Sequence, residues 1–127
     1  MRFNASENSC GVNPLNVHTA YQARRHTSEY PGVAPHIVTW TESDDLERMR
    51  SDVKALAART DLTMVYVHWG TSMTPFVHDF QKEIGHAAID AGAHAVFGGH
   101  QHVVCGIEFY KGHPIVHGSG NLLFDKW

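Results

Sequence analysis

The sequence has little of what marks several large classes of protein. Its two cysteines, Cys10 and Cys105, can form at most one disulfide and cannot build a disulfide framework. No apolar run reaches the roughly 18 residues that a membrane-spanning helix needs, and the first ten residues lack the apolar centre of a secretion signal. The formal net charge is −3, so we expect no general attraction to nucleic acid or anionic lipid.

Histidine is the residue type that the sequence has in excess. There are 11 His against 10 Lys and Arg in 127 residues. Because neutral imidazole is the commonest metal ligand among side chains, this count favours a metal site without locating it. The length and the 43% hydrophobic content are those of a single domain with one core.

The two parts of the chain differ in their patterns. Residues 1–42 carry many turn formers, so we predict an irregular N-terminal segment with one short strand at 37–40. An irregular run of that length is unusual in a complete compact domain. In residues 43–127 we predict helices at 43–59 and 76–91, and strands at 62–68, 95–97, 103–110 and 114–117. This order indicates an α/β fold whose last two strands form a hairpin.

Local signals refine three of these elements. The strand at 62–68 is almost continuously apolar, as is typical of a buried strand. Thr41 and Asp44 have capping-box spacing, with Ser43 as a rival cap, and Asp44 lies four residues before Arg48 on the first helix. Gly92 is expected to follow the end of the second helix in the left-handed conformation.

Histidines stand at three predicted strand ends, the places where open α/β sheets bind ligands. His68 ends one strand, His100 and His102 follow the next, and His117 follows the last. In an extended segment both imidazoles of an H-x-H pair face the same way, which suits Zn, Mn or Fe. Solvated loop histidines are the alternative for this pair, and hydrogen-bonded structural roles are the alternative for His68 and His117.

Other catalytic motifs fit the sequence poorly. There is no G-x-S-x-G elbow, no P-loop and no pair of closely spaced cysteines for a zinc finger. A cupin would need a glycine where His94 stands. Cys105 lies inside a predicted strand, so we expect a buried, inert thiol.

Five short motifs follow one another in the second half of the chain. They are H-W-G at 68–70, A-I-D-A-G-A at 88–93, G-H-x-H at 99–102, G-I-E-x-Y at 106–110 and G-N-L-x-F-D at 120–125. In this order they resemble the bacterial capsule-synthesis or poly-gamma-glutamate-synthesis (CapA-like) family, a branch of the calcineurin-like metallophosphoesterases. The resemblance covers residues 62–126 strongly and the upstream residues weakly. It implies that residues 43–127 are the C-terminal part of a layered metallophosphoesterase-like α/β sandwich with a mixed sheet and a terminal hairpin.

The resemblance also implies a metal centre. His68, His100 and His102 would match metal ligands of the family, with Gly99, His117 and Asn121 as contacts at the same rim. Divalent Mn, Zn or Fe would activate a water for attack on a phosphoester or a poly-gamma-glutamate-related substrate. Members of the family often act at the cell envelope, but this sequence does not indicate a compartment.

Departures from the family pattern concern the rest of that centre. The upstream aspartates and the Asn-His segment of the family are not visible, and Gly99 stands where the family more often has histidine. The sequence around His117 also differs from the family's Y-S-L-G-N. We therefore expect a metal-dependent hydrolase-like protein present as a partial domain. A non-catalytic metal-binding or scaffold protein and an inactive truncated product are the alternatives.

Overall fold

Two helices and six strands make up the fold in the computed structural model, which describes residues 4–24 and 32–123. In chain order they are β1 (Val17–Gln22), β2 (His36–Thr41), α1 (Ser43–Ala57), β3 (Met64–His68), α2 (Asp79–Asp90), β4 (Ala95–Gly99), β5 (Ile107–Tyr110) and β6 (His113–Val116). The predicted fold class is confirmed, since a mixed sheet combines with helices and ends in a hairpin. No helix among the described residues is long and apolar enough to cross a bilayer.

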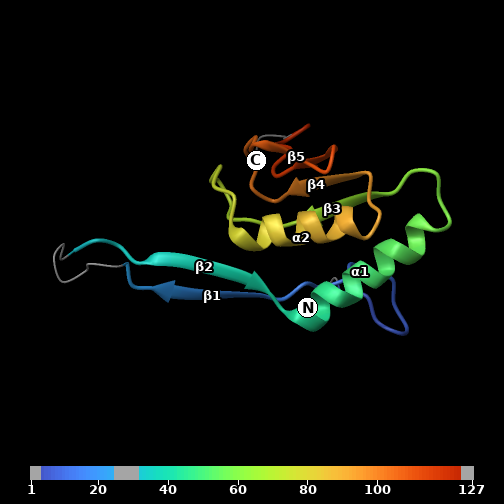
Figure 1. The fold of residues 1–127 in the computed structure, drawn as a ribbon, viewed down its shortest axis with the longest axis horizontal. Coiled ribbons are helices and arrows are strands. Elements are labelled where there is room, and N and C mark those ends of the chain that lie inside the picture. The colour runs from blue at the N-terminus through green and yellow to red at the C-terminus, as the bar shows by residue number, and fades with distance from the viewer. Residues whose placement is uncertain (1–3, 25–31, 124–127) are drawn as a thin grey trace.

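A four-stranded sheet in the order β3-β4-β6-β5 positions the strand ends of interest. β3 and β4 are parallel, β4 and β6 are parallel, and β5 returns antiparallel to β6. Figure 1 shows both helices on the same side of this sheet. The apolar stripe of α2 packs on it, and Gly85 brings the helix so close that an added Cβ would lie 3.1 Å from Ile115 Cγ2. The core of the molecule therefore lies between α2 and the central strands, with α1 packed against α2.

β3 is an edge strand, and the prediction that it is buried is wrong. Val65 and Val67 pack against the core, whereas Met64 and Tyr66 on the other face are 58% and 67% exposed. The apolar run does form a strand, but α2 covers only one face of the sheet. A continuous apolar sequence could not reveal that the second face of this strand is open.

The N-terminal segment contains a hairpin, so the prediction of an irregular segment with one short strand is corrected. β1 pairs antiparallel with β2 from Val17 opposite Thr41 to Gln22 opposite His36. In Figure 1 the hairpin projects beyond the rest of the fold. Its base is held on α2, where Phe80 N–H donates to Thr39 Oγ1 (3.3 Å). The division of the chain into 1–42 and 43–127 stays a prediction.

The helix limits differ from prediction by a few residues. Glu42, rather than Thr41 or Ser43, caps α1 by accepting a hydrogen bond from the Ser43 N–H (3.2 Å). α1 ends at Ala57, two residues before the predicted limit. α2 begins three residues later than predicted, and its first turn is held by the hydrogen bond from His78 N–H to Gln81 Oε1 (2.9 Å). Gly92 has φ 110° after the end of α2, as predicted.

A second correction concerns the first turn of α1. Arg48 pairs with Asp45 (2.7 Å) and not with Asp44. Asp45 faces the N-terminal segment, where the backbone and side-chain amides of Asn16 both donate to its Oδ2 at 2.8 Å. Asp45 thus ties α1 to the residue that precedes β1.

Candidate metal centre

The ends of β3 and β4 bring His68 and His100 to the same rim of the sheet. His68 is the last residue of β3 and pairs in register with Gly99, the last residue of β4. His100 follows directly, and its ring centroid lies 4.6 Å from that of His68. The ring of His102 lies 6.3 Å from that of His100. His68 and His100 therefore meet at the carboxyl end of a parallel strand pair, and the ring of His102 lies beside that of His100 at 6.3 Å.

The backbone at this rim is strained. His100 has φ 85° and His102 has φ 58°, in the left-handed region that side chains other than glycine seldom adopt. Each such residue costs on the order of 1–3 kcal/mol and persists only where surrounding contacts impose it. Strain of this kind at two alternate residues is typical of a loop shaped for binding rather than for stability.

Two observations concern the protonation of the imidazoles. Burial, followed by the neighbouring charges of His100 and His102, lowers the pKa of His68. This favours the neutral ring, which is the form that binds metals. The Nδ1 of His102 lies 2.9 Å from Asn121 Oδ1, within hydrogen-bond distance. Asn121, predicted as a rim contact, thus orients His102.

Gln101, between the two histidines, is a site residue that the sequence reasoning missed. Its side chain is fully buried, and Nε2 donates to the carbonyls of Thr74 and Phe76 at 3.2 Å. The Met73 N–H donates in turn to Gln101 O (2.8 Å). Gln101 thus anchors the H-x-H segment to the loop between β3 and α2. The H-x-H segment is not extended as the sequence reasoning assumed, since His100 and His102 have positive φ, so the pattern gave no signal for Gln101.

His117 lies apart from the other three histidines. Its ring is buried, stacks on Trp69 at 5.9 Å and approaches Glu108 Oε2 with Nε2 (3.1 Å). His86 on α2 approaches the other oxygen of the same carboxylate at 2.6 Å. The face of the sheet that carries His117 is therefore the face covered by α2, whereas His68 shares the open face with Tyr66. The predicted role of His117 as a rim contact stays a prediction.

Glu108 joins these two histidines and was not singled out as a functional residue. Burial raises the pKa of its carboxyl, but the hydrogen bonds from His86 and His117 lower that pKa by more, so the net pKa lies below the usual value. The carboxylate links β5 to α2 and to the end of β6. Its role in the geometry is structural, since it holds the sheet layer against the helix layer.

A fuller set of ligands is not formed by the described part of the chain. Within residues 4–24 and 32–123, no group of three or more His, Cys, Asp or Glu side chains is arranged to hold a metal ion. Cys105 is buried, as predicted, and burial raises the pKa of its thiol. Phe124 and Asp125 of the last motif lie outside the described residues.

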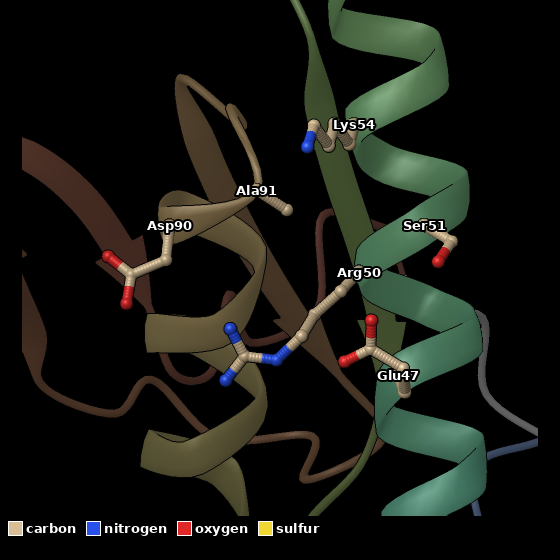
Figure 2. A pocket seen from close by; sticks show the side chains of 6 residues that line it. All are labelled: Glu47, Arg50, Ser51, Lys54, Asp90 and Ala91. Carbon is tan, nitrogen blue, oxygen red and sulfur yellow. The ribbon is translucent and has the colours of Figure 1, made fainter.

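A surface pocket of about 240 Å³ lies away from the histidines, between α1 and α2. It is lined by Glu47, Arg50, Ser51, Lys54, Asp90 and Ala91. Figure 2 shows the Arg50 side chain reaching from α1 toward α2. Lys111 donates to Asp90 at 2.6 Å, which lowers the pKa of that carboxyl. The pocket is a charged seam between helices, and none of the predicted site residues lines it.

The comparison with known families accounts for the ordered motifs. The family described as "Bacterial capsule synthesis protein PGA_cap" matches residues 4–126. The chain belongs to this family. The PGA_cap match includes β1, β2 and the histidine rim in one continuous segment, and it bears out the resemblance that the motifs indicated.

Similarity to individual curated proteins points to the same family. "PGA biosynthesis protein CapA" of Bacillus subtilis (strain 168) is 33% identical over 106 residues, which is 84% of this chain and 25% of the relative. "Capsule biosynthesis protein CapA" of Bacillus anthracis is 35% identical over 66 residues, 52% of this chain and 16% of the relative. "Probable polyglutamine synthesis accessory protein" of Mycobacterium tuberculosis (strain CDC 1551 / Oshkosh) is 32% identical over 111 residues, 84% of this chain and 27% of the relative. The chain thus spans about a quarter of the length of the Bacillus subtilis and Mycobacterium tuberculosis relatives.

Proposed function

We propose that the chain contributes a metal-binding part to a metal-dependent hydrolase of the PGA_cap family that acts in capsule or poly-gamma-glutamate synthesis. The observation that carries this proposal is the approach of the His68 and His100 rings to 4.6 Å at the ends of two parallel strands, with His102 next to them. The family and the names of the relatives support the process, and the histidines support the chemistry.

The histidines suit a divalent Mn, Zn or Fe ion. The lowered pKa of His68 favours the neutral imidazole, the form that binds a metal. A metal bound here would polarise a phosphoryl oxygen and make a bound water nucleophilic near neutral pH. In this proposal His68, His100 and His102 are ligands, and carboxylate ligands come from a segment that these 127 residues do not contain. The chain would then be the C-terminal part of a larger domain.

Metal binding by the chain itself tests the first half of the proposal. Isothermal titration with Mn²⁺ or Zn²⁺ should give binding to the natural chain and at least a tenfold weaker affinity for the His100→Ala, His102→Ala double variant. His36→Ala, which removes an exposed histidine from β2, is the matched control and should bind like the natural chain. Equal affinity in all three proteins would contradict the metal centre.

Hydrolysis tests the second half. A longer protein that includes the upstream family motifs, loaded with Mn²⁺, should hydrolyse a simple phosphodiester such as bis-p-nitrophenyl phosphate. The same double substitution should abolish this activity. Activity unchanged by the double substitution would show that the histidines do not serve the reaction.

A non-catalytic metal-binding or scaffold role is the second candidate. It is favoured because, within the described ranges, no group of three or more His, Cys, Asp or Glu side chains is arranged to hold a metal ion. This candidate predicts metal binding by the histidines together with no hydrolysis by the longer protein. Because both candidates predict metal binding, the activity measurement separates them.

A further inference from the structure

Tyr66 lies on the open face of β3, two residues before His68. Its partner in the parallel register is Phe97, but its ring leans along the strand toward the rim. A Cβ added to Gly99 would collide with the hydroxyl of Tyr66, and its three nearest atoms would all belong to the Tyr66 ring and hydroxyl. The tyrosine hydroxyl therefore occupies the space that a side chain at position 99 would need.

That space borders the histidines. Gly99 pairs with His68 across the two strands and directly precedes His100. The Tyr66 hydroxyl, lying against Gly99, is therefore flanked by the two residues whose rings approach to 4.6 Å. Tyr66 is 67% exposed, and among the described residues its hydroxyl makes no hydrogen bond to the protein. A solvent-accessible hydroxyl donor thus stands next to the candidate ligands.

We propose that Tyr66 is a substrate-contacting residue whose hydroxyl donates a hydrogen bond to a non-bridging oxygen of a phosphoryl group held at His68 and His100. The inference rests on the proposed function, because the histidines would place the phosphoryl group through their metal. A phenolic O–H is a suitable donor to a charged oxygen, and such hydrogen bonds are stronger than those between neutral groups. Gly99 permits this contact because it has no Cβ, which would otherwise collide with the Tyr66 hydroxyl.

Phosphate binding tests this role without a need for turnover. The chain is titrated with inorganic phosphate in the presence and absence of saturating Mn²⁺. Tyr66→Phe should weaken phosphate affinity in Mn²⁺ by about tenfold, the usual cost of one hydrogen bond to a charged group, and should leave Mn²⁺ affinity unchanged. Tyr21→Phe, which removes the hydroxyl of a tyrosine 73% exposed on β1, is the matched control. It should change neither affinity.

Gly99→Ala tests the geometric part. Its Cβ should displace the Tyr66 hydroxyl and weaken phosphate binding in the natural chain. In a Tyr66→Ala background, where the colliding atoms are gone, the same substitution should have no further effect. Equal effects of Gly99→Ala in both backgrounds would contradict the contact.

The outcomes separate the two proposals. Mn²⁺ affinity unchanged in His68→Ala and His100→Ala would overturn the metal centre. Phosphate affinity unchanged in Tyr66→Phe, with and without Mn²⁺, would overturn the role of Tyr66 whatever the histidines do. A loss of Mn²⁺ affinity in Tyr66→Phe would also overturn it, since the hydroxyl would then act on the metal site and not on the phosphoryl group.

Discussion

Gly98 leaves the space through which the Trp69 indole reaches the carbonyl of His117. The Trp69 Nε1–H donates to His117 O at 2.8 Å, and a Cβ at position 98 would collide with both atoms. This contact joins the end of β3 to the end of β6 across β4. One buried hydrogen bond therefore fixes the strand ends next to the histidines. It can form only because residue 98 is glycine.

Gly98→Ala should lower the free energy of unfolding by about 3 kcal/mol, because overpacking and the loss of a buried hydrogen bond act together. Urea denaturation measures this change. Gly106→Ala is the control, since no atom lies within 4 Å of a Cβ at that position and its φ is not positive. A similar loss of stability in both variants would argue against the special fit at position 98.

Asp45 should make stability depend on pH. The hydrogen bonds from the Asn16 backbone, and then the Arg48 side chain, lower the pKa of its carboxyl in the folded state. The stabilisation is therefore present above the unfolded pKa and is lost as pH falls below about 4 through the folded pKa. Denaturation midpoints measured between pH 7 and pH 2 should fall less steeply in Asp45→Asn than in the natural chain. Asp44→Asn, in the same turn, should retain the natural slope.

At the residue scale, the sequence predicts the histidines better than their neighbours. Apolar runs mark the strands, and the strand ends then locate His68, His100 and His102. Gln101 and Tyr66 could not be found in this way. The burial of Gln101 depends on the path of the loop between β3 and α2, and the direction of the Tyr66 ring depends on the missing side chain at Gly99.

At the scale of elements, a single carboxylate connects three of them. Glu108 on β5 accepts hydrogen bonds from His86 on α2 and from His117 after β6. The His86 ring also stacks on Tyr110 of β5 at 3.9 Å. The terminal hairpin is thus held to the helix layer by polar contacts in addition to the packing of Tyr110 against the core.

Glu108→Gln should destabilise the fold by about 1–3 kcal/mol, because an amide offers one oxygen to two imidazole donors and leaves a buried donor unsatisfied. Thermal unfolding followed by circular dichroism would detect this change. Glu7→Gln, at an exposed position of the N-terminal segment, makes the same chemical change and should be neutral. An equally small effect in both variants would show that Glu108 does not stabilise the contact between the terminal hairpin and α2.

The elements differ in how far their sequences predict them. α1, α2 and β4 carry apolar patterns that need no partner to be recognised, and their positions were predicted within a few residues. β1 is mostly polar and exposed, so only its pairing with β2 makes it a strand. Caps depend on which side chain reaches the first N–H, which explains why Glu42 and not Thr41 caps α1.

At the scale of the molecule, the four-stranded sheet has one covered and one open face. The open face has no charged residue on its strands and exposes Met64, Tyr66, Phe97, Ile107 and Phe109. Monomeric soluble proteins seldom expose apolar patches that extend across a whole sheet. Within the described residues, helices therefore cover only one face of the four-stranded sheet.

This face should bind a hydrophobic dye such as anilinonaphthalene sulfonate. Phe109→Ser should reduce dye fluorescence while changing stability by less than about 0.5 kcal/mol, because the side chain is 72% exposed. Val12→Ser removes an apolar side chain that is 63% exposed but lies outside the sheet, and it should leave the fluorescence unchanged. Equal dye binding in both variants would show that the dye does not use the open face.

The projecting hairpin has a consequence for the lifetimes of individual amide protons. β1 and β2 each have one neighbouring strand, so about every second N–H along them points to solvent, whereas β4 is bonded on both sides. Opening the hairpin tip exposes little apolar surface, but opening β4 requires its separation from both β3 and β6. Deuterium should therefore replace the protons of residues 19–22 and 36–38 well before those of Val96 and Phe97, and the chain should exchange in at least two separate phases.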